Sequence, residues 1–73
     1  MKYVIVKLYD AQITVGNSNS WEWDDNTGML NVYNVYNEIV LSTRQEEVLN
    51  VIRADGHDEL ERLSNFLDNL YKK

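Results

Sequence analysis

The spacing of the hydrophobic residues changes once along this chain, and that change limits the folds open to it. From residue 2 to about residue 43, apolar, β-branched and aromatic residues form short strand-like runs, the first with the period of two expected of a strand. From residue 60 to residue 71, leucines recur at alternating spacings of three and four, as in an amphipathic helix. The sequence therefore predicts an α+β domain in which a C-terminal helix covers a small antiparallel meander of four or five strands.

The chain of 73 residues is one domain, near the size at which a single hydrophobic core becomes marginal. It contains no cysteine, which excludes disulfides and thiolate-bound metals, and its one histidine is His57. We therefore expect no metal and no cofactor. Helix packing and self-association are the remaining sources of stability, and we expect a homodimer because two-fold symmetry is the commonest form.

The formal net charge is −5 at pH 7, and the lysines and arginines are spread along the chain. Binding to phosphate groups needs clustered cations, so we expect no direct contact with nucleic acid and none with a membrane. An acidic surface instead favours encounter with a protein that has a basic surface. The first ten residues are too short and too charged for a signal peptide or a membrane span, so the expected location is cytoplasmic.

Residues 2–9 and 12–15 are predicted to be strands, with a break at Asp10 and Ala11. In the first strand Val4, Val6 and Leu8 share one face. The opposite face mixes apolar and polar residues. We therefore expect both faces of this strand to be partly covered.

The stretch from residue 17 to residue 33 is predicted to be a polar loop, residues 17–20, followed by a β-hairpin. Its turn runs from Asp25 to Gly28 and closes with the glycine in the left-handed conformation. With a three-residue loop, Asp25 would face Met29. One face of the hairpin would then carry Trp21, Trp23, Met29 and Tyr33, and the other Glu22, Asp24, Leu30 and Val32.

Residues 31–37 repeat Asn-Val-Tyr, and we interpret them as the end of one strand, a bend and the entry to a strand at 38–42. Residues 43–54 permit two interpretations. A capping-box pattern from Thr43 to Glu46, followed by apolar residues at helical spacing, predicts a second short helix at 44–54. The β-branched residues between Val48 and Ile52 predict a strand instead, and we favour the strand.

The C-terminal segment is predicted to be a helix that packs on the sheet, with pairing across a dimer axis as the alternative. Asp55 or Asp58 is expected to accept hydrogen bonds from its first backbone amides. Lys72 and Lys73 suit the negative end of the helix dipole. The apolar stripe consists of Leu60, Leu63, Leu67 and Leu70, widened by Phe66 and Tyr71.

No combination of residues predicts catalysis. The chain has no cysteine nucleophile, its three glycines stand alone instead of forming a phosphate loop, and His57 has no strained serine nearby. His57 is expected to be exposed at the start of the helix. Residues 24–28 have some ligands of a calcium loop, but position twelve would be Val35 instead of glutamate, so we interpret them as a turn. We therefore expect that the protein is not an enzyme.

The aromatic residues are the most informative about function. Two tryptophans and five tyrosines exceed what so small a core easily encloses, and both types are frequent in protein interfaces. For the tryptophans, core and interface are equally compatible with the sequence. Acidic residues flank them, which suits a basic groove such as one that binds nucleic acid. The candidate partner-binding residues are Trp21, Glu22, Trp23, Asp24, Asp25, Tyr33 and Tyr36.

The leading hypothesis is a non-catalytic protein-binding module that inhibits a nucleic-acid-handling or defence protein by occupying its phosphate-binding surface. In composition alone, the chain is similar to small acidic proteins of phages and other bacterial mobile elements, several of which inhibit such host enzymes. This resemblance covers no motif and assigns no residue. One alternative is a homo-oligomer that binds a small ligand or nucleotide, although the sequence places no cation near the tryptophans. Another is a structural subunit of a larger assembly.

Overall fold

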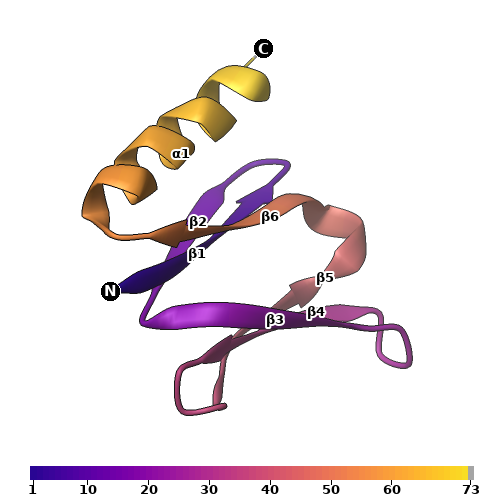
Figure 1. Cartoon of the computed structure of the whole chain (residues 1–73). Coiled ribbons are helices and arrows are strands. Elements are labelled where there is room, and N and C mark those ends of the chain that lie inside the picture. Colours follow the sequence, from indigo (N-terminus) through magenta and orange to yellow (C-terminus); the bar gives the residue numbers. More distant parts are fainter. Residues whose placement is uncertain (73) are drawn as a thin grey trace.

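The computed structural model describes residues 1–72 as three layers (Figure 1). A helix lies on one antiparallel sheet, and a second antiparallel sheet covers the other face of the first. Sheet A has the strand order β2-β1-β6, and sheet B has the order β3-β4-β5. The elements are β1 (Lys2–Leu8), β2 (Gln12–Gly16), β3 (Ser18–Asp24), β4 (Met29–Asn34), β5 (Ile39–Arg44), the 3-10 helix η1 (Gln45–Glu47), β6 (Val48–Asp55) and α1 (His57–Leu70).

The predicted α+β class is confirmed, but the strands number six within residues 1–72 instead of four or five. Residues 18–20, which were expected to be part of a loop, lengthen the first arm of the predicted hairpin and belong to β3. Only Asn17, in the left-handed conformation with φ 54°, separates β2 from β3, so one extended segment bends there and passes from sheet A to sheet B. Ser18 is fully buried, and its hydroxyl donates to the carbonyl of Tyr33. Ser18 can be buried there because the Tyr33 carbonyl satisfies its hydroxyl.

Residues 43–54 contain no second α-helix, and the favoured strand is confirmed as β6. Thr43 lies inside β5, so the predicted capping box is wrong, and the helical part is the single turn η1. The physical reason is pairing: β1 offers a partner along nearly the whole of β6, with Val51 opposite Val6 and Ile52 opposite Ile5. β-branched residues fit that pleated surface better than a short isolated helix.

The strand β1 lies at the centre of the molecule and is covered on both faces, as expected. On one face Val4 and Val6 pack against Leu30 and Val32 of sheet B. On the other, Ile5 belongs to a second cluster with residues of β6 and α1. Three consecutive residues of β1, at positions 4 to 6, have no exposed surface. Sheet A is therefore an internal layer, whereas sheet B has one covered face and one open face.

Three of the predicted stripe leucines, Leu60, Leu63 and Leu67, pack on sheet A together with Tyr71. The remaining two stripe positions, Phe66 and Leu70, stay 55% and 54% exposed. The expected capping by Asp55 or Asp58 is wrong. The N-cap position is Gly56, at φ 96°, and no side chain caps it.

At this helix start the Glu59 carboxylate instead accepts a hydrogen bond from the backbone N–H of Asp55 (3.1 Å). The prediction for Lys73 lies outside the described residues, and Lys72 follows the end of α1. None of the described residues forms a helix long and apolar enough to cross a membrane.

Candidate functional site

The β3–β4 loop has four residues, Asp25 to Gly28, instead of the predicted three. The Asp24 carboxylate accepts from the backbone N–H of Asn26 (3.0 Å), and the Asp24 carbonyl accepts from the N–H of Gly28 (2.9 Å). Gly28 takes the left-handed conformation, with φ 71°. The longer turn pairs Asp24 with Met29, so the whole register moves by one residue and every side chain of β3 changes its partner.

The predicted face containing both tryptophans, Met29 and Tyr33 is therefore wrong. Trp21 pairs with Val32 and Trp23 with Leu30, which places the tryptophans on the face that covers sheet A. Trp21 is half-buried in the core between the sheets. Trp23 shares that face, but it is 47% exposed on the edge strand β3.

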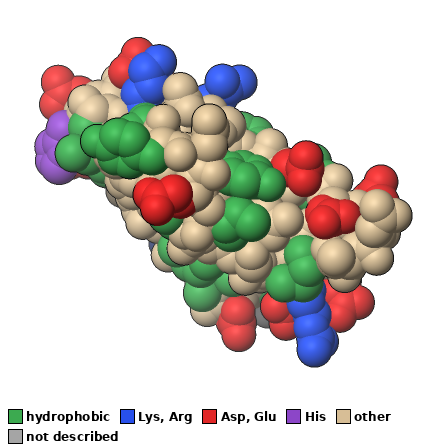
Figure 2. Space-filling model, turned by 90° about the horizontal axis from the view of Figure 1, so that it is seen from below, with side chains coloured by type: hydrophobic (Ala, Val, Ile, Leu, Met, Phe, Trp, Pro, Cys, Tyr) green, Lys and Arg blue, Asp and Glu red, His purple; other side chains and the backbone are tan. Residues whose placement is uncertain are grey.

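The opposite face of sheet B is open, and we name it the acidic face. At its centre the Ser42 hydroxyl donates to the Asn31 side chain (2.7 Å). Apolar and aromatic side chains flank this pair, among them Tyr33 and its cross-strand neighbour Ile39, which is 55% exposed. In Figure 2, which views the molecule from the side of sheet B, acidic side chains stand between apolar ones. Cross-strand pairing assigns to this face Ser20, Glu22, Asp24, Met29, Asn31, Tyr33, Ile39, Ser42 and Arg44.

The charge of the protein is concentrated in sheet B and its loops. Residues 18–47 have a formal charge of −5, equal to that of the whole chain, so the rest of the chain is neutral overall. The one cation of this segment, Arg44, forms an exposed ion pair with Glu46 (3.6 Å). An exposed pair of this kind contributes only about 0–1 kcal/mol. The six acids are Glu22, Asp24, Asp25, Glu38, Glu46 and Glu47.

The β4–β5 turn presents the most exposed aromatic residue among the predicted contacts, Tyr36, at 73% exposure. The Asn34 side chain holds the turn: its oxygen accepts from the backbone N–H groups of Tyr36 (2.8 Å) and Glu38 (3.0 Å). Its amide donates to the Glu38 carboxylate (3.0 Å). The Asn34 side chain thus fixes a turn that exposes Val35 and Tyr36, next to Ile39 and Val40 at the exposed start of β5.

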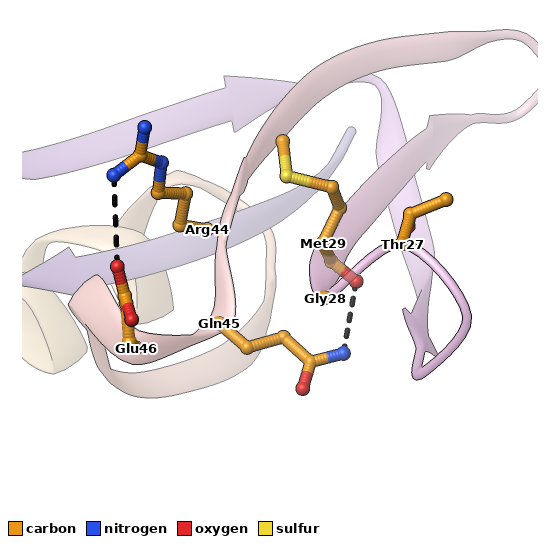
Figure 3. A pocket seen from close by; sticks show the side chains of 6 residues that line it. All are labelled: Thr27, Gly28, Met29, Arg44, Gln45 and Glu46. Carbon is orange, nitrogen blue, oxygen red and sulfur yellow. Dashed lines mark hydrogen bonds and ion pairs between the residues drawn. The ribbon is translucent and has the colours of Figure 1, made fainter.

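An open pocket of about 590 Å³ lies at the other end of sheet B, between the β3–β4 loop and η1 (Figure 3). The Gln45 side chain closes its base by donating to the carbonyl of Met29 (3.0 Å), and the Gln45 backbone donates to the carbonyl of Gly28 (2.9 Å). Sequence reasoning missed this pocket because its two walls are 16 residues apart and no local motif joins them. The lining residues are Thr27, Gly28, Met29, Arg44, Gln45 and Glu46.

A smaller hollow of about 160 Å³ lies beside Trp21 and is lined by Asn19, Ser20, Trp21 and Arg53. The Arg53 guanidinium carbon lies 5.5 Å from the centre of the Trp21 ring, in a cation–π arrangement. The sequence places no cation near the tryptophans, and the structure corrects this. β6 brings Arg53 across from 32 positions away in the chain.

The structure thus divides the predicted contact residues into groups. Glu22, Asp24 and Tyr33 share the acidic face, and Asp25 lies in the loop at its end. Tyr36 projects from the turn at the opposite end. Trp21 and Trp23 lie on the covered face.

For chemistry, the arrangement offers binding surfaces. Within residues 1–72, no three His, Cys, Asp or Glu side chains gather as a metal site would require. His57 is exposed at the first position of α1, and residues 25–28 form a turn, both as expected from the sequence. Comparison with protein-family models, with curated proteins and with solved structures finds no match for this chain.

Proposed function

We propose that this protein is a non-catalytic protein-binding module that binds a basic protein through the acidic face of sheet B. One observation carries the proposal: an open sheet face with exposed apolar side chains coincides with the segment that holds the whole net charge. Interfaces combine apolar contact area with complementary charge, which steers encounter and selects the partner. Tyr36 and Ile39 supply exposed contact area, and Glu22 and Asp25 supply exposed charge.

The partner that fits this surface is a protein whose own ligand is a phosphate backbone. A groove that binds nucleic acid presents clustered Lys and Arg, and carboxylates spread over a sheet face can occupy such a groove in place of phosphates. The protein would then inhibit a nucleic-acid-handling or defence enzyme by competition, with no catalytic step of its own. A cytoplasmic location is part of this proposal.

The test is capture of partners by the tagged chain from a lysate of its source organism or of that organism's host, at low and at high salt. Glu22→Lys combined with Asp25→Lys reverses charge beside the acidic face at two exposed positions that carry little packing. Glu61→Lys combined with Asp68→Lys changes the net charge equally, on exposed positions of α1, and is the matched control.

We expect one basic protein to be captured at low salt, lost with the sheet B variant and retained with the control. Adding nucleic acid should release it if the two compete for one groove. Equal capture by both variants would contradict binding through the acidic face. Recovery of the chain alone would favour a structural subunit instead.

Self-association is assigned to a different side of the molecule. Two copies of sheet B with its loops and η1 repel each other, because residues 18–47 carry a formal charge of −5 in each copy. The helix α1 has a smaller formal charge of −3, and it exposes Phe66 and Leu70, one helical turn apart. We therefore propose that a homodimer forms through α1.

Sedimentation equilibrium tests the dimer. Phe66→Ser combined with Leu70→Ser is expected to give a monomer, while Tyr36→Ser, which removes a more exposed aromatic side chain from the β4–β5 turn, should leave the dimer intact. A dimer that survives the α1 variant, or that is lost with Tyr36→Ser, would place the interface elsewhere.

A further inference from the structure

The hollow beside Trp21 has the opposite chemistry from the acidic face. Asn19, Ser20, Trp21 and Arg53 line it, and the side chains of Asn19, Trp21 and Arg53 carry N–H donors. None of these side chains makes a hydrogen bond or an ion pair with another residue within residues 1–72. Unused donors from two sheets therefore converge on one small space.

Arg53 differs from the other two arginines. Arg44 pairs with Glu46, and Arg62 pairs with Glu59, but no ion pair holds Arg53 within the described residues, in a protein with an excess of acids. The Arg53 guanidinium carbon lies over the Trp21 ring, 5.5 Å from its centre. A cation–π contact uses none of the guanidinium N–H donors in a hydrogen bond to a carboxylate, so they stay available to an oxyanion.

The backbone also turns toward this hollow. The pairing of β3 with β4 is irregular between Ser18 and Ser20, so Asn19 is an extra residue in a β-bulge. Bulges re-aim side chains, and they are frequent beside binding sites. Asn19 and Ser20 line the hollow from this bulge, while Arg53 lines it from β6.

The local charge favours an anion despite the acidic protein. Lys2 pairs with Asp55, and Arg53 with Val4, so these two cations and one acid lie on the same face of sheet A. Glu22, the nearest acid along β3, points to the opposite face of sheet B. This face of sheet A therefore has one more cation than acids, although the chain as a whole is negative.

The size limits the ligand to one group. The hollow of about 160 Å³ is smaller than the roughly 300–1,000 Å³ that bury a drug-sized ligand. A carboxylate would be satisfied by the guanidinium alone, whereas a phosphate has a further oxygen for the side-chain amide of Asn19. We propose that the hollow between Trp21 and Arg53 binds a single phosphate group, either inorganic phosphate or the phosphate monoester of a larger molecule.

The test uses the full chain with Trp23→Phe, so that Trp21 is the one fluorescent tryptophan. Titration with inorganic phosphate at constant ionic strength should change its emission with saturation, and should shift the backbone amide resonances of Asn19, Ser20 and Arg53. Arg53→Gln should weaken binding at least about tenfold, as expected for loss of charge-assisted hydrogen bonds. Arg62→Gln on α1 is the matched control and should leave binding unchanged.

Asn19→Ala provides a second variant that removes the side-chain amide, and it should weaken binding about threefold. Phosphoserine binding more tightly than inorganic phosphate would identify a phosphorylated molecule as the ligand, and equal binding would identify phosphate itself. A response that does not saturate, equal binding by Arg53→Gln, or acetate binding as tightly as phosphate would overturn the proposal. The site lies on the covered side of β3, so its failure leaves the acidic face untouched.

Discussion

Sheets A and B have three strands each, but they differ in how many of their faces are covered. Sheet A lies between α1 and sheet B, and consecutive residues Val4, Ile5 and Val6 of its central strand are fully buried. Sheet B buries one face and exposes the other, and with its loops and η1 it has a formal charge equal to that of the whole chain. The comparison teaches that in so small a domain one sheet is covered on both faces, while the other contributes one face to the core and leaves its second face open.

The largest expected effect tests the burial of sheet A on both of its faces. Ile5→Ala removes a fully buried side chain between sheet A and α1, and should lower the free energy of unfolding by about 2–5 kcal/mol. Ile39→Ala, on the open face of sheet B, should change it by less than about 0.5 kcal/mol. Urea denaturation of both variants measures the difference. Similar losses would mean that a partner or second copy covers sheet B in solution.

The next effect separates the two tryptophans. Trp21 packs in the core between the sheets, so Trp21→Ala should cost about 2 kcal/mol of stability. Trp23→Ala should lower the free energy of unfolding by less than about 1 kcal/mol, because the Trp23 side chain is 47% exposed. Thermal and urea unfolding provide the measurement. The reverse order would show that Trp23 is covered in the protein in solution, and would return it to the candidate interface.

The smallest effect concerns two glycines, Gly28 in the β3–β4 loop and Gly16 at the end of β2. Gly28→Ala places a side chain at φ 71°, with no atom within 4 Å of the new Cβ, so backbone strain alone should destabilise the fold by about 1 kcal/mol. In Gly16→Ala the new Cβ meets its nearest atom at 3.7 Å, an ordinary contact, and stability should change by a few tenths of a kcal/mol at most. Equal unfolding midpoints would refute the strained four-residue loop.

The hairpin shows where sequence reasoning succeeded and where it failed. The turn, its closing glycine and the two strands were all predicted from residues 21–33. The loop length was wrong by one residue, because the Asp24 side chain caps the turn and draws Asp25 out of the strand. Side chains alternate between the two faces of a strand. The shift of one residue therefore placed Trp21 on the face of Leu30 and Val32, instead of the face of Met29 and Tyr33.

The sites depended on contacts between distant parts of the chain. Arg53 reaches Trp21, and Gln45 reaches Met29, through the packing and pairing of strands far apart in sequence. No spacing rule links such pairs, because their proximity follows from strand order and from the bend at Asn17. The concentration of charge was visible in the sequence, but its coincidence with an open sheet face was not.

The sequence by itself determined the α+β class, the C-terminal helix, both covered faces of β1 and the acidic character of residues 18–47. These follow from local periodicity and composition, which act over a few residues. Only the tertiary structure decided which face each tryptophan occupies, that residues 48–55 pair as a strand, and that Arg53 meets Trp21. Those outcomes depend on register and on the packing of one sheet against another, since the energies involved arise between segments that are distant in the chain.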